Sequence, residues 1–204
     1  MNLLDHINNL NWPKLDSKLF SANEPWNWLN ASIDFVGKEE KFYIYASGYR
    51  VAAEILFQNL DSKTREHDVL IYPIVFLMRQ GIELLLKDII ITSYKILGFK
   101  QGFPKHHSLV KLWNEVKSVQ KKMHIKVDKK EIQAIDYLMN EFELIDPFSS
   151  AFRYPVDHKE DESLKEIRKI DLKNFMEVSN GIYNYFEGTT IQVAEYWDNI
   201  KGSV

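Results

Sequence analysis

Three charged residues recur at helical spacing inside a long apolar stretch of this 204-residue chain. Arg79, Glu83 and Lys87 stand four residues apart within the segment 72–91, where most other residues are apolar. Residues four apart share one face of an α-helix, so these side chains are expected to form one charged stripe. Two cations around a carboxylate suit an anion such as phosphate, which a guanidinium grips with two hydrogen bonds. Spacing alone, however, favours ordinary surface ion pairs, each worth about 0.2 to 0.5 kcal/mol.

A second set of reactive residue types lies in the aromatic segment 145–158, where Arg153 and His158 enclose four residues. Metal-free cleavage of RNA needs a base for the ribose 2′-OH, an acid for the leaving oxygen and cations beside the developing phosphorane charge. Arginine and histidine can supply these functions, and His107, at the start of a predicted helix, is a further imidazole. This spacing of arginine and histidine is common by chance, so it is a weak signal by itself.

We expect the segment 145–158 to fold back over the apolar helix, so that these residues share one anion-selective pocket. Pro147 and Pro155 exclude a continuous helix there, and a loop so rich in aromatic residues is expected to be held against the helices. The candidate catalytic residues are therefore Arg153, His158 and His107, and the candidate substrate-binding residues are Arg79, Glu83, Lys87 and Tyr154.

The composition excludes several other kinds of chemistry. There is no cysteine, which removes disulfides, thiolate metal sites and cysteine nucleophiles together. The net charge of -3 and the isoelectric point of about 6.1 leave no overall basic field for nucleic acid, so any contact with RNA must be local. The adjacent His106 and His107 have no carboxylate or histidine four positions on, which is a poor arrangement for a metal. We expect no metal and no cofactor.

The apolar run at 72–91 is long enough to cross a membrane. Each of its three charges would cost about 2.5 to 3.5 kcal/mol at the bilayer centre, so we expect a buried helix and no membrane. The first residues lack a basic region followed by an apolar core and a cleavage site, which predicts a cytoplasmic location.

The spacing of apolar residues predicts an all-α chain. Glycine and proline are few, and no persistent alternation of apolar and polar residues indicates a strand. Residues 39–204 are expected to form an up-and-down bundle of four to five main helices, with Pro73 in the first turn of the central one. The predicted helices span 39–60, 70–97, 108–121, 128–144 and 171–186, with a short terminal helix over 191–200.

An irregular arm, residues 1–38, precedes the predicted bundle and is rich in Asn, Trp and Pro. Its tryptophans need burial and are expected to pack across the bundle: Trp12, Trp26 and Trp28. Small residues in the first predicted helix would let the central helix approach closely, namely Ala46, Gly48, Ala52 and Ala53.

Two sequence motifs resemble those of a known family. The first is a helix pair, Tyr49-x-x-Ala52-Ala53 followed by Phe76-Leu77-x-Arg79-Gln80-x-Ile82-Glu83, which continues to Lys87, and the second is His107-Ser108-Leu109-x-x-Leu112-Trp113. Together they resemble HEPN-domain proteins, in which an R-x-x-x-E-x-x-x-K helix is followed by an H-[DS]-L-x-x-L helix. The resemblance runs from about residue 40 to residue 158 and implies a bundle of four or five helices.

The resemblance also implies an activity. Many members are homodimeric, metal-independent endoribonucleases of toxin–antitoxin, CRISPR-associated and anti-phage systems, in which an arginine followed after four to six residues by a histidine comes from both subunits. Arg153 and His158 match this spacing, whereas Tyr154 stands where a polar residue is common and Pro155 prevents the usual helical setting. Other members lack the motif and bind RNA or serve as scaffolds.

The leading hypothesis is a protein that acts on RNA as a metal-independent endoribonuclease or toxin of a defence or toxin–antitoxin system. In it, His158 or His107 moves protons, and Arg153 with Arg79 stabilises the phosphorane. The alternative is a non-catalytic subunit of such a system that binds RNA or protein, in which the charged stripe is an internal salt-bridge network. A third hypothesis is a bundle that binds a small molecule. The expected partners are RNA or a nucleotide, a second copy of the chain, and an antitoxin or defence-system protein.

Overall fold

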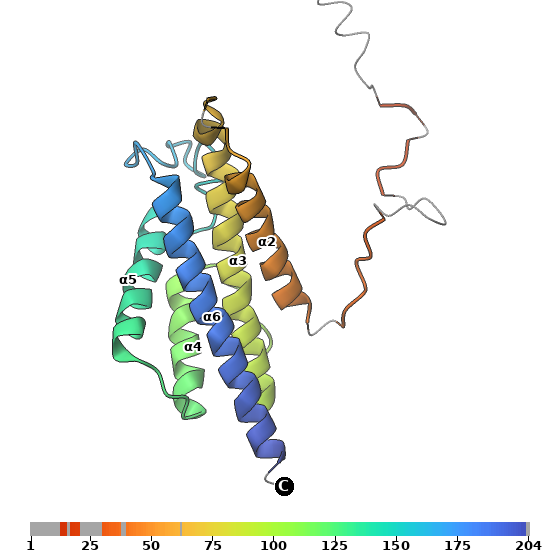
Figure 1. Ribbon diagram of the computed structural model, residues 1–204, viewed down its shortest axis with the longest axis vertical. Coiled ribbons are helices and arrows are strands. Elements are labelled where there is room, and N and C mark those ends of the chain that lie inside the picture. Colours follow the sequence, from red (N-terminus) through yellow and green to blue (C-terminus); the bar gives the residue numbers. More distant parts are fainter. Residues whose placement is uncertain (1–12, 16, 21–29, 38–39, 62, 203–204) are drawn as a thin grey trace, which may run out of the picture. The chain divides into compact units, whose positions relative to one another are not determined.

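As Figure 1 shows, the computed structural model describes most of the chain, namely residues 13–15, 17–20, 30–37, 40–61 and 63–202. The chain divides into two units, residues 1–37 and 38–204. The described residues of the first unit contain no helix or strand. The arm's tryptophans lie outside the described residues, so their expected burial stays a prediction: Trp12, Trp26 and Trp28.

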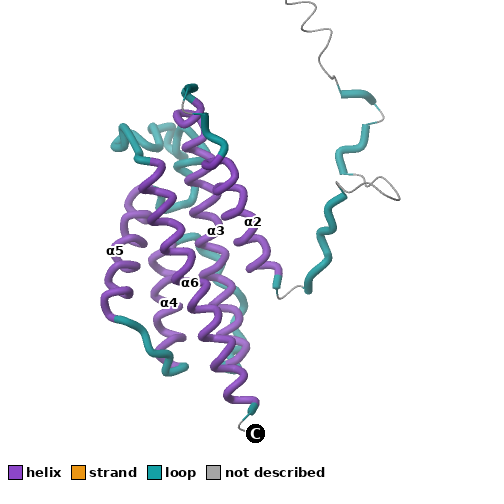
Figure 2. The backbone as a smooth tube through the Cα atoms, viewed as in Figure 1, coloured by secondary structure: helices purple, strands orange, loops and turns teal. Residues whose placement is uncertain are grey.

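Five α-helices make up the described part of the second unit, and loops connect them (Figure 2). The β structure in this part is a single isolated bridge between Val156 and Glu162. The prediction of an all-α chain is therefore confirmed. The helices are α2 (Lys41–Gln58), α3 (Glu66–Ile96), α4 (Leu109–Lys122), α5 (Lys129–Ile145) and α6 (Leu172–Lys201).

Helix α3 is the central element of the bundle. It packs against α2, α4 and α6, while α5 packs against α4. The pairs α2 and α3, α4 and α5, and α5 and α6 run in opposite directions (Figure 1). Helices α3 and α4 run in the same direction, because the connection 97–108 leads back along α3: His107 lies beside Glu83 in the middle of α3, whereas Lys122, at the end of α4, lies over the ring of Phe99. The main core gathers apolar side chains from α3, α4, α5 and α6, including Ile82, Leu86, Trp113, Met139 and Phe186. The predicted all-α bundle is thus observed, with five main helices in the part of the chain that is described, and the parallel pair α3 and α4 departs from the predicted up-and-down order.

Helices α2 and α3 approach closely at Gly81. A Cβ atom added to Gly81 would lie 3.1 Å from the backbone oxygen of Ala46. Ala46 and Ala53 are completely buried, as expected for small residues at a helix contact. Gly48 differs from the prediction, because nothing lies within 4 Å of where its Cβ would be.

The beginning of α3 differs from the prediction. The helix starts at Glu66, so Pro73 lies inside it and not in its first turn. Proline has no N–H to donate to the carbonyl of Val69, four residues earlier. Val69 is 67% exposed, so water can hydrogen-bond to that carbonyl, and the helix tolerates the proline.

Helix α6 is a single helix of 30 residues, and the expected separate helix over 191–200 was wrong. The hydroxyl of Thr189 donates to the carbonyl oxygen of Tyr185 at 3.1 Å, and that of Thr190 donates to Phe186 at 3.2 Å. Both polar side chains are therefore satisfied within the helix. Thr189 is also buried, so packing against neighbouring side chains stabilises the helical conformation in this polar stretch.

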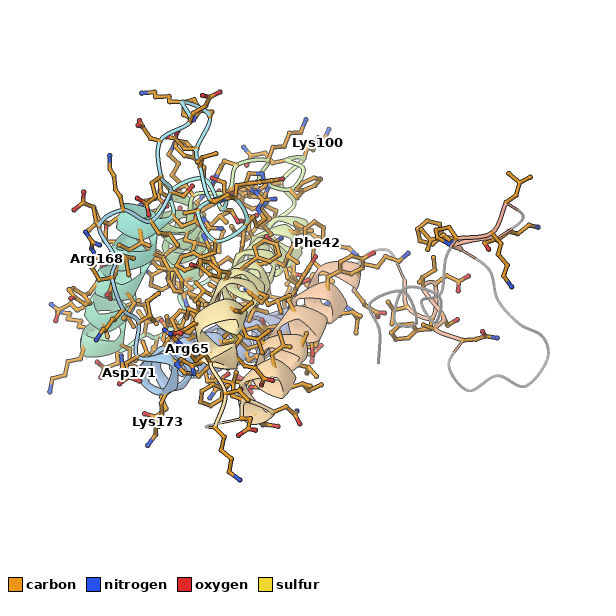
Figure 3. The ribbon with its side chains drawn as sticks, turned by 90° about the horizontal axis from the view of Figure 1, so that it is seen from above. Phe42, Arg65, Lys100, Arg168, Asp171 and Lys173 are labelled. Carbon is orange, nitrogen blue, oxygen red and sulfur yellow. The ribbon has the colours of Figure 1, made fainter. Side chains whose placement is uncertain are left out.

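Side-chain caps begin the helices that follow the central one. Ser108 accepts a hydrogen bond from the Lys111 N–H and starts α4, and Asp128 accepts one from Lys130 and starts α5. Asp171, labelled at the start of α6 in Figure 3, accepts from the Asn174 N–H. Such oxygens satisfy N–H groups that have no partner inside the helix. Ser108 and Asp128 stand where the predicted helices 108–121 and 128–144 begin, so these two beginnings are confirmed.

Among the described helices, α3 is the one long and apolar enough to cross a membrane by length and composition. A buried core helix passes the same test. Half of the most apolar window of α3 is buried inside the protein, and three helices pack against it. Its apolar composition is thus explained by its central place in the bundle.

Candidate functional site

The charged stripe on α3 is buried. Arg79, Glu83 and Lys87 are 0%, 1% and 4% exposed. The Glu83 carboxylate joins the two cations, because Arg79 Nη1 donates to one oxygen at 3.2 Å and Lys87 Nζ donates to the other at 2.9 Å. The stripe is therefore an internal network, not the surface ion pairs that spacing alone favours.

Arg79 connects three parts of the chain. Its Nη2 donates to the carbonyl oxygens of His107, just before α4, at 3.0 Å and of Asp146, just after α5, at 3.1 Å. Its Nε lies 3.4 Å from Asp146 Oδ2, within ion-pair distance but without a well-formed hydrogen bond. Asp146 is 1% exposed and was missed by sequence reasoning. The sequence signal that could have identified Asp146 is its position directly before Pro147, at the end of a predicted helix.

Asp146 also shapes the loop that follows α5. Its Oδ1 accepts hydrogen bonds from the backbone N–H groups of Ser150 at 2.7 Å and Ala151 at 3.0 Å. The next residue, Phe152, is 7% exposed. The expectation that this aromatic loop is held against the bundle is confirmed at Phe152, and the link runs through Asp146 to Arg79, whereas Phe148 and Tyr154 are 69% and 57% exposed.

His107 joins the buried network to the surface. Its Nδ1 lies 2.8 Å from Oε1 of Glu83, while 59% of its side chain is exposed. Its Nε2 has no hydrogen-bond partner among the described residues. The buried network beside this ring has no net formal charge, because the cations Arg79 and Lys87 are balanced by the carboxylates of Glu83 and Asp146. A buried carboxylate that binds one ring nitrogen fixes the tautomer and leaves the other available.

Arg153 lies on the outside of α3, near but not within this network. Its Nε donates to the carbonyl oxygen of Ser149 at 2.6 Å, and its Cζ lies 5.5 Å from the ring centroids of both Phe76 and Tyr154. Phe76 precedes Arg79 by about one helical turn. No hydrogen bond or ion pair between described residues joins Arg153 to Glu83 or to a histidine, so the guanidinium stays exposed and available.

His158 lies in a tight turn within residues 156–162. The Asp157 N–H donates to the Asp161 carbonyl at 2.9 Å, and Asp157 Oδ1 accepts from the N–H groups of Lys159 and Asp161. These backbone donors, that of Lys159 first, lower the pKa of Asp157. Within the described residues no hydrogen bond or ion pair joins His158 to Arg153, so their joint action stays a prediction.

A second polar cluster, not predicted from sequence, lies between α2, α3 and α6. Arg50 forms ion pairs with Glu54 at 3.0 Å and Glu187 at 3.2 Å, and the Tyr43 hydroxyl donates to Glu187 at 3.3 Å. Asp88 is 7% exposed. Burial raises the pKa of its carboxyl to about 6, and a hydrogen bond from the Tyr43 backbone offsets only part of that rise.

Two cavities open in this part of the bundle. The smaller, about 300 Å³, is lined by Tyr72, residues 151–155 and residues 162–164, and so contains Arg153 and Tyr154. The larger, about 390 Å³, is mostly apolar, lies between α3, α5 and α6, and is lined by none of the candidate residues. No group of three or more His, Cys, Asp or Glu side chains in the described part is placed to hold a metal ion.

The fold and this site define a small helical-bundle protein in which a buried charged stripe anchors an exposed imidazole. The chain belongs to the HEPN-domain family, whose sequence model matches residues 58–188, more than half of the chain. HEPN domains occur in ribonuclease, toxin and nucleotide-binding contexts. The matched region contains Arg79, Glu83, His107 and Asp146. No curated protein and no solved structure matches the chain.

Proposed function

We propose that this protein is a metal-independent endoribonuclease in which His107 is the acid–base group. The observation that supports this most is the 2.8 Å contact between the His107 Nδ1 and the buried Glu83 carboxylate, with the rest of the ring exposed. If Nδ1 carries the hydrogen that Glu83 accepts, Nε2 has a free lone pair at the surface. That is the form of imidazole a general base requires.

The reaction needs no co-reactant. His107 Nε2 takes the proton of the ribose 2′-OH, the 2′-oxygen forms a bond to phosphorus, and the bond from phosphorus to the 5′-oxygen breaks. The imidazolium then returns the same proton to the leaving 5′-oxygen. The products are a 2′,3′-cyclic phosphate and a 5′-hydroxyl, and protons balance. His158 remains a candidate for a second acid.

The cations divide between two roles in this proposal. Arg153 is exposed and held by Ser149 and Phe76, so its guanidinium can stabilise the charge on the phosphorane. Arg79 and Lys87 have almost no exposed surface. The substrate-binding role expected for them and for Glu83 therefore becomes one of positioning, because they hold the carboxylate that orients His107.

The alternative is a non-catalytic subunit that binds RNA or protein in a defence or toxin–antitoxin system. The observation that favours it is that both cations of the stripe are paired inside the protein. A network closed in this way can act purely to join α3, α4 and the loop after α5.

A homodimer is part of the proposal. Helix α2 exposes Tyr45, Val51 and Ile55, which are 58%, 46% and 53% exposed, and Val51 and Ile55 stand four residues apart on one side of the helix. Exposed apolar side chains grouped in this way are typical of an interface. Sedimentation of the parent and of the Ile55→Lys variant tests this. The parent is expected to sediment as a dimer and the variant as a monomer, and a monomeric parent would contradict the proposal.

Cleavage of labelled RNA in EDTA tests the proposed activity. His107→Ala is expected to lower the rate by about 100-fold or more, the usual contribution of a general acid–base group. His67→Ala is the matched control. Like His107, His67 is about half exposed, at 54%, and lies near a carboxylate, 3.3 Å from that of Asp68, but this carboxylate is exposed and not buried. Equal cleavage by both variants would overturn the role of His107. RNA that is bound but left intact by the parent would support the alternative.

A further inference from the structure

The smaller cavity has the composition of a site for a flat ring. Two tyrosines line it, Tyr72 from α3 and Tyr154 from the loop after α5, and they are 49% and 57% exposed. Exposed aromatic rings beside an arginine are the usual stacking surface for bases of single-stranded RNA. A volume of about 300 Å³ is at the lower end for ligand sites, which suits one base and not two.

We propose that this cavity binds a single guanine base of the RNA and that Glu162 selects it. The inference rests on the proposed function, for which it names the preferred nucleotide. Guanine presents neighbouring N–H donors, the ring N1–H and the exocyclic amino group, on one edge. A carboxylate only accepts hydrogen bonds and has two oxygens to receive them. Adenine and cytosine place an acceptor nitrogen beside the amino group, and uracil has one N–H between two carbonyls, so neither arrangement fits.

Glu162 is placed and available for this role. It lines the cavity, and its side chain makes no hydrogen bond or ion pair with another described residue. Its backbone is held by the bridge to Val156, and the N–H of the next residue, Ser163, donates to the Pro155 carbonyl at 3.0 Å. Glu162 thus lines the cavity on a stretch of backbone that is held in place, and no described residue occupies its carboxylate oxygens.

Arg153 connects this cavity to the proposed chemistry. It lines the same cavity, and Ser149 and Phe76 hold it on the outside of α3. A phosphate attached to the nucleotide in the cavity would therefore meet an exposed guanidinium. This arrangement predicts cleavage next to guanosine.

Calorimetric titration with GMP, AMP, CMP and UMP in EDTA tests the inference without relying on cleavage. The parent is expected to bind GMP roughly tenfold more tightly than AMP, as one bidentate contact to a base allows. Glu162→Gln is expected to remove this preference. Glu160→Gln is the matched control, because Glu160 lies two residues away, is exposed and does not line the cavity. Thermal melting checks that both variants stay folded.

Equal affinity of the parent for GMP and AMP would overturn the inference, as would an unchanged preference in Glu162→Gln. The result is separable from the proposed function. GMP preference in a protein that leaves RNA intact would keep the guanine site and reject the nuclease. Cleavage with no preference for guanosine and no GMP preference would keep the nuclease and reject the guanine site.

Discussion

The Nδ1 atom of His107 lies 2.8 Å from a carboxylate oxygen of Glu83, and the two side chains differ greatly in exposure, 59% for the histidine and 1% for the glutamate. The same glutamate oxygen accepts a hydrogen bond from Lys87. An imidazole at the surface is thus oriented by a group in the core, and any change to the buried network should change both stability and the orientation of the ring.

Glu83→Gln should destabilise the fold strongly. The substitution leaves Arg79 and Lys87 buried without a full negative charge between them, and breaking such a buried pair costs about 3 to 5 kcal/mol. Urea denaturation measures the loss. Glu54→Gln is the control, because it breaks the partly exposed pair with Arg50 and should cost less than about 1 kcal/mol. If both variants lost a similar free energy of unfolding, burial of the stripe would not increase the cost of removing its carboxylate.

Asp146→Ala should loosen the loop after α5. It removes the acceptor of the Ser150 and Ala151 N–H groups and the ion pair with Arg79, so hydrogen exchange at these amides should accelerate and global stability should fall by about 3 kcal/mol or more. Asp157→Ala is the control, since that carboxylate also accepts two backbone N–H groups but is exposed. It should speed exchange only within its own turn.

Asp88 should make stability fall as pH rises through about 6. Burial raises the pKa of this carboxyl from 3.8 to about 6, so between these values the folded chain holds a proton that the unfolded chain has released. Its favourable contribution is complete below pH 4 and is lost as pH rises through 6. Asp88→Asn should therefore gain stability over the parent, by up to about 3 kcal/mol, between pH 4 and pH 7.

Urea unfolding of both proteins across this pH range measures the gain. Asp157→Asn provides a control of opposite sign, because backbone hydrogen bonds lower the pKa of Asp157. Stability profiles of the parent and Asp88→Asn that stay parallel from pH 4 to pH 7 would contradict the raised pKa.

Gly81→Ala should destabilise the contact between α2 and α3. The new Cβ would lie 3.1 Å from the backbone oxygen of Ala46, and backbone cannot move aside as a flexible side chain can. Overpacking of this kind costs about 1 to 3 kcal/mol. Gly188→Ala, in α6 with nothing within 4 Å of its Cβ, should instead gain about 0.5 to 1 kcal/mol from helix propensity. Thermal or urea unfolding compares them, and a Gly81→Ala variant as stable as Gly188→Ala would show that α2 shifts without cost.

Local signals in the sequence were reliable for the helices and the caps. Apolar spacing predicted the helices from α2 to α5, and the oxygens of Ser108 and Asp128 marked two of their beginnings. Local signals failed at two places inside long helices. The chain remains helical through Pro73 because the exposed Val69 leaves the unpaired carbonyl open to water, and it remains helical through Thr189 because packing buries that residue.

The candidate site shows the same division. The sequence by itself determined that Arg79, Glu83 and Lys87 share one side of a helix, because a repeat of four residues follows the helical turn. Only the tertiary structure decided that this side faces inward and that Asp146, 67 residues from Arg79, completes the network. It also placed Arg153 and His158, both exposed, in the region between α5 and α6 with no hydrogen bond or ion pair between these two described residues. Spacing along the chain sets which residues of one helix are neighbours, whereas the packing of helices and loops sets which distant groups meet.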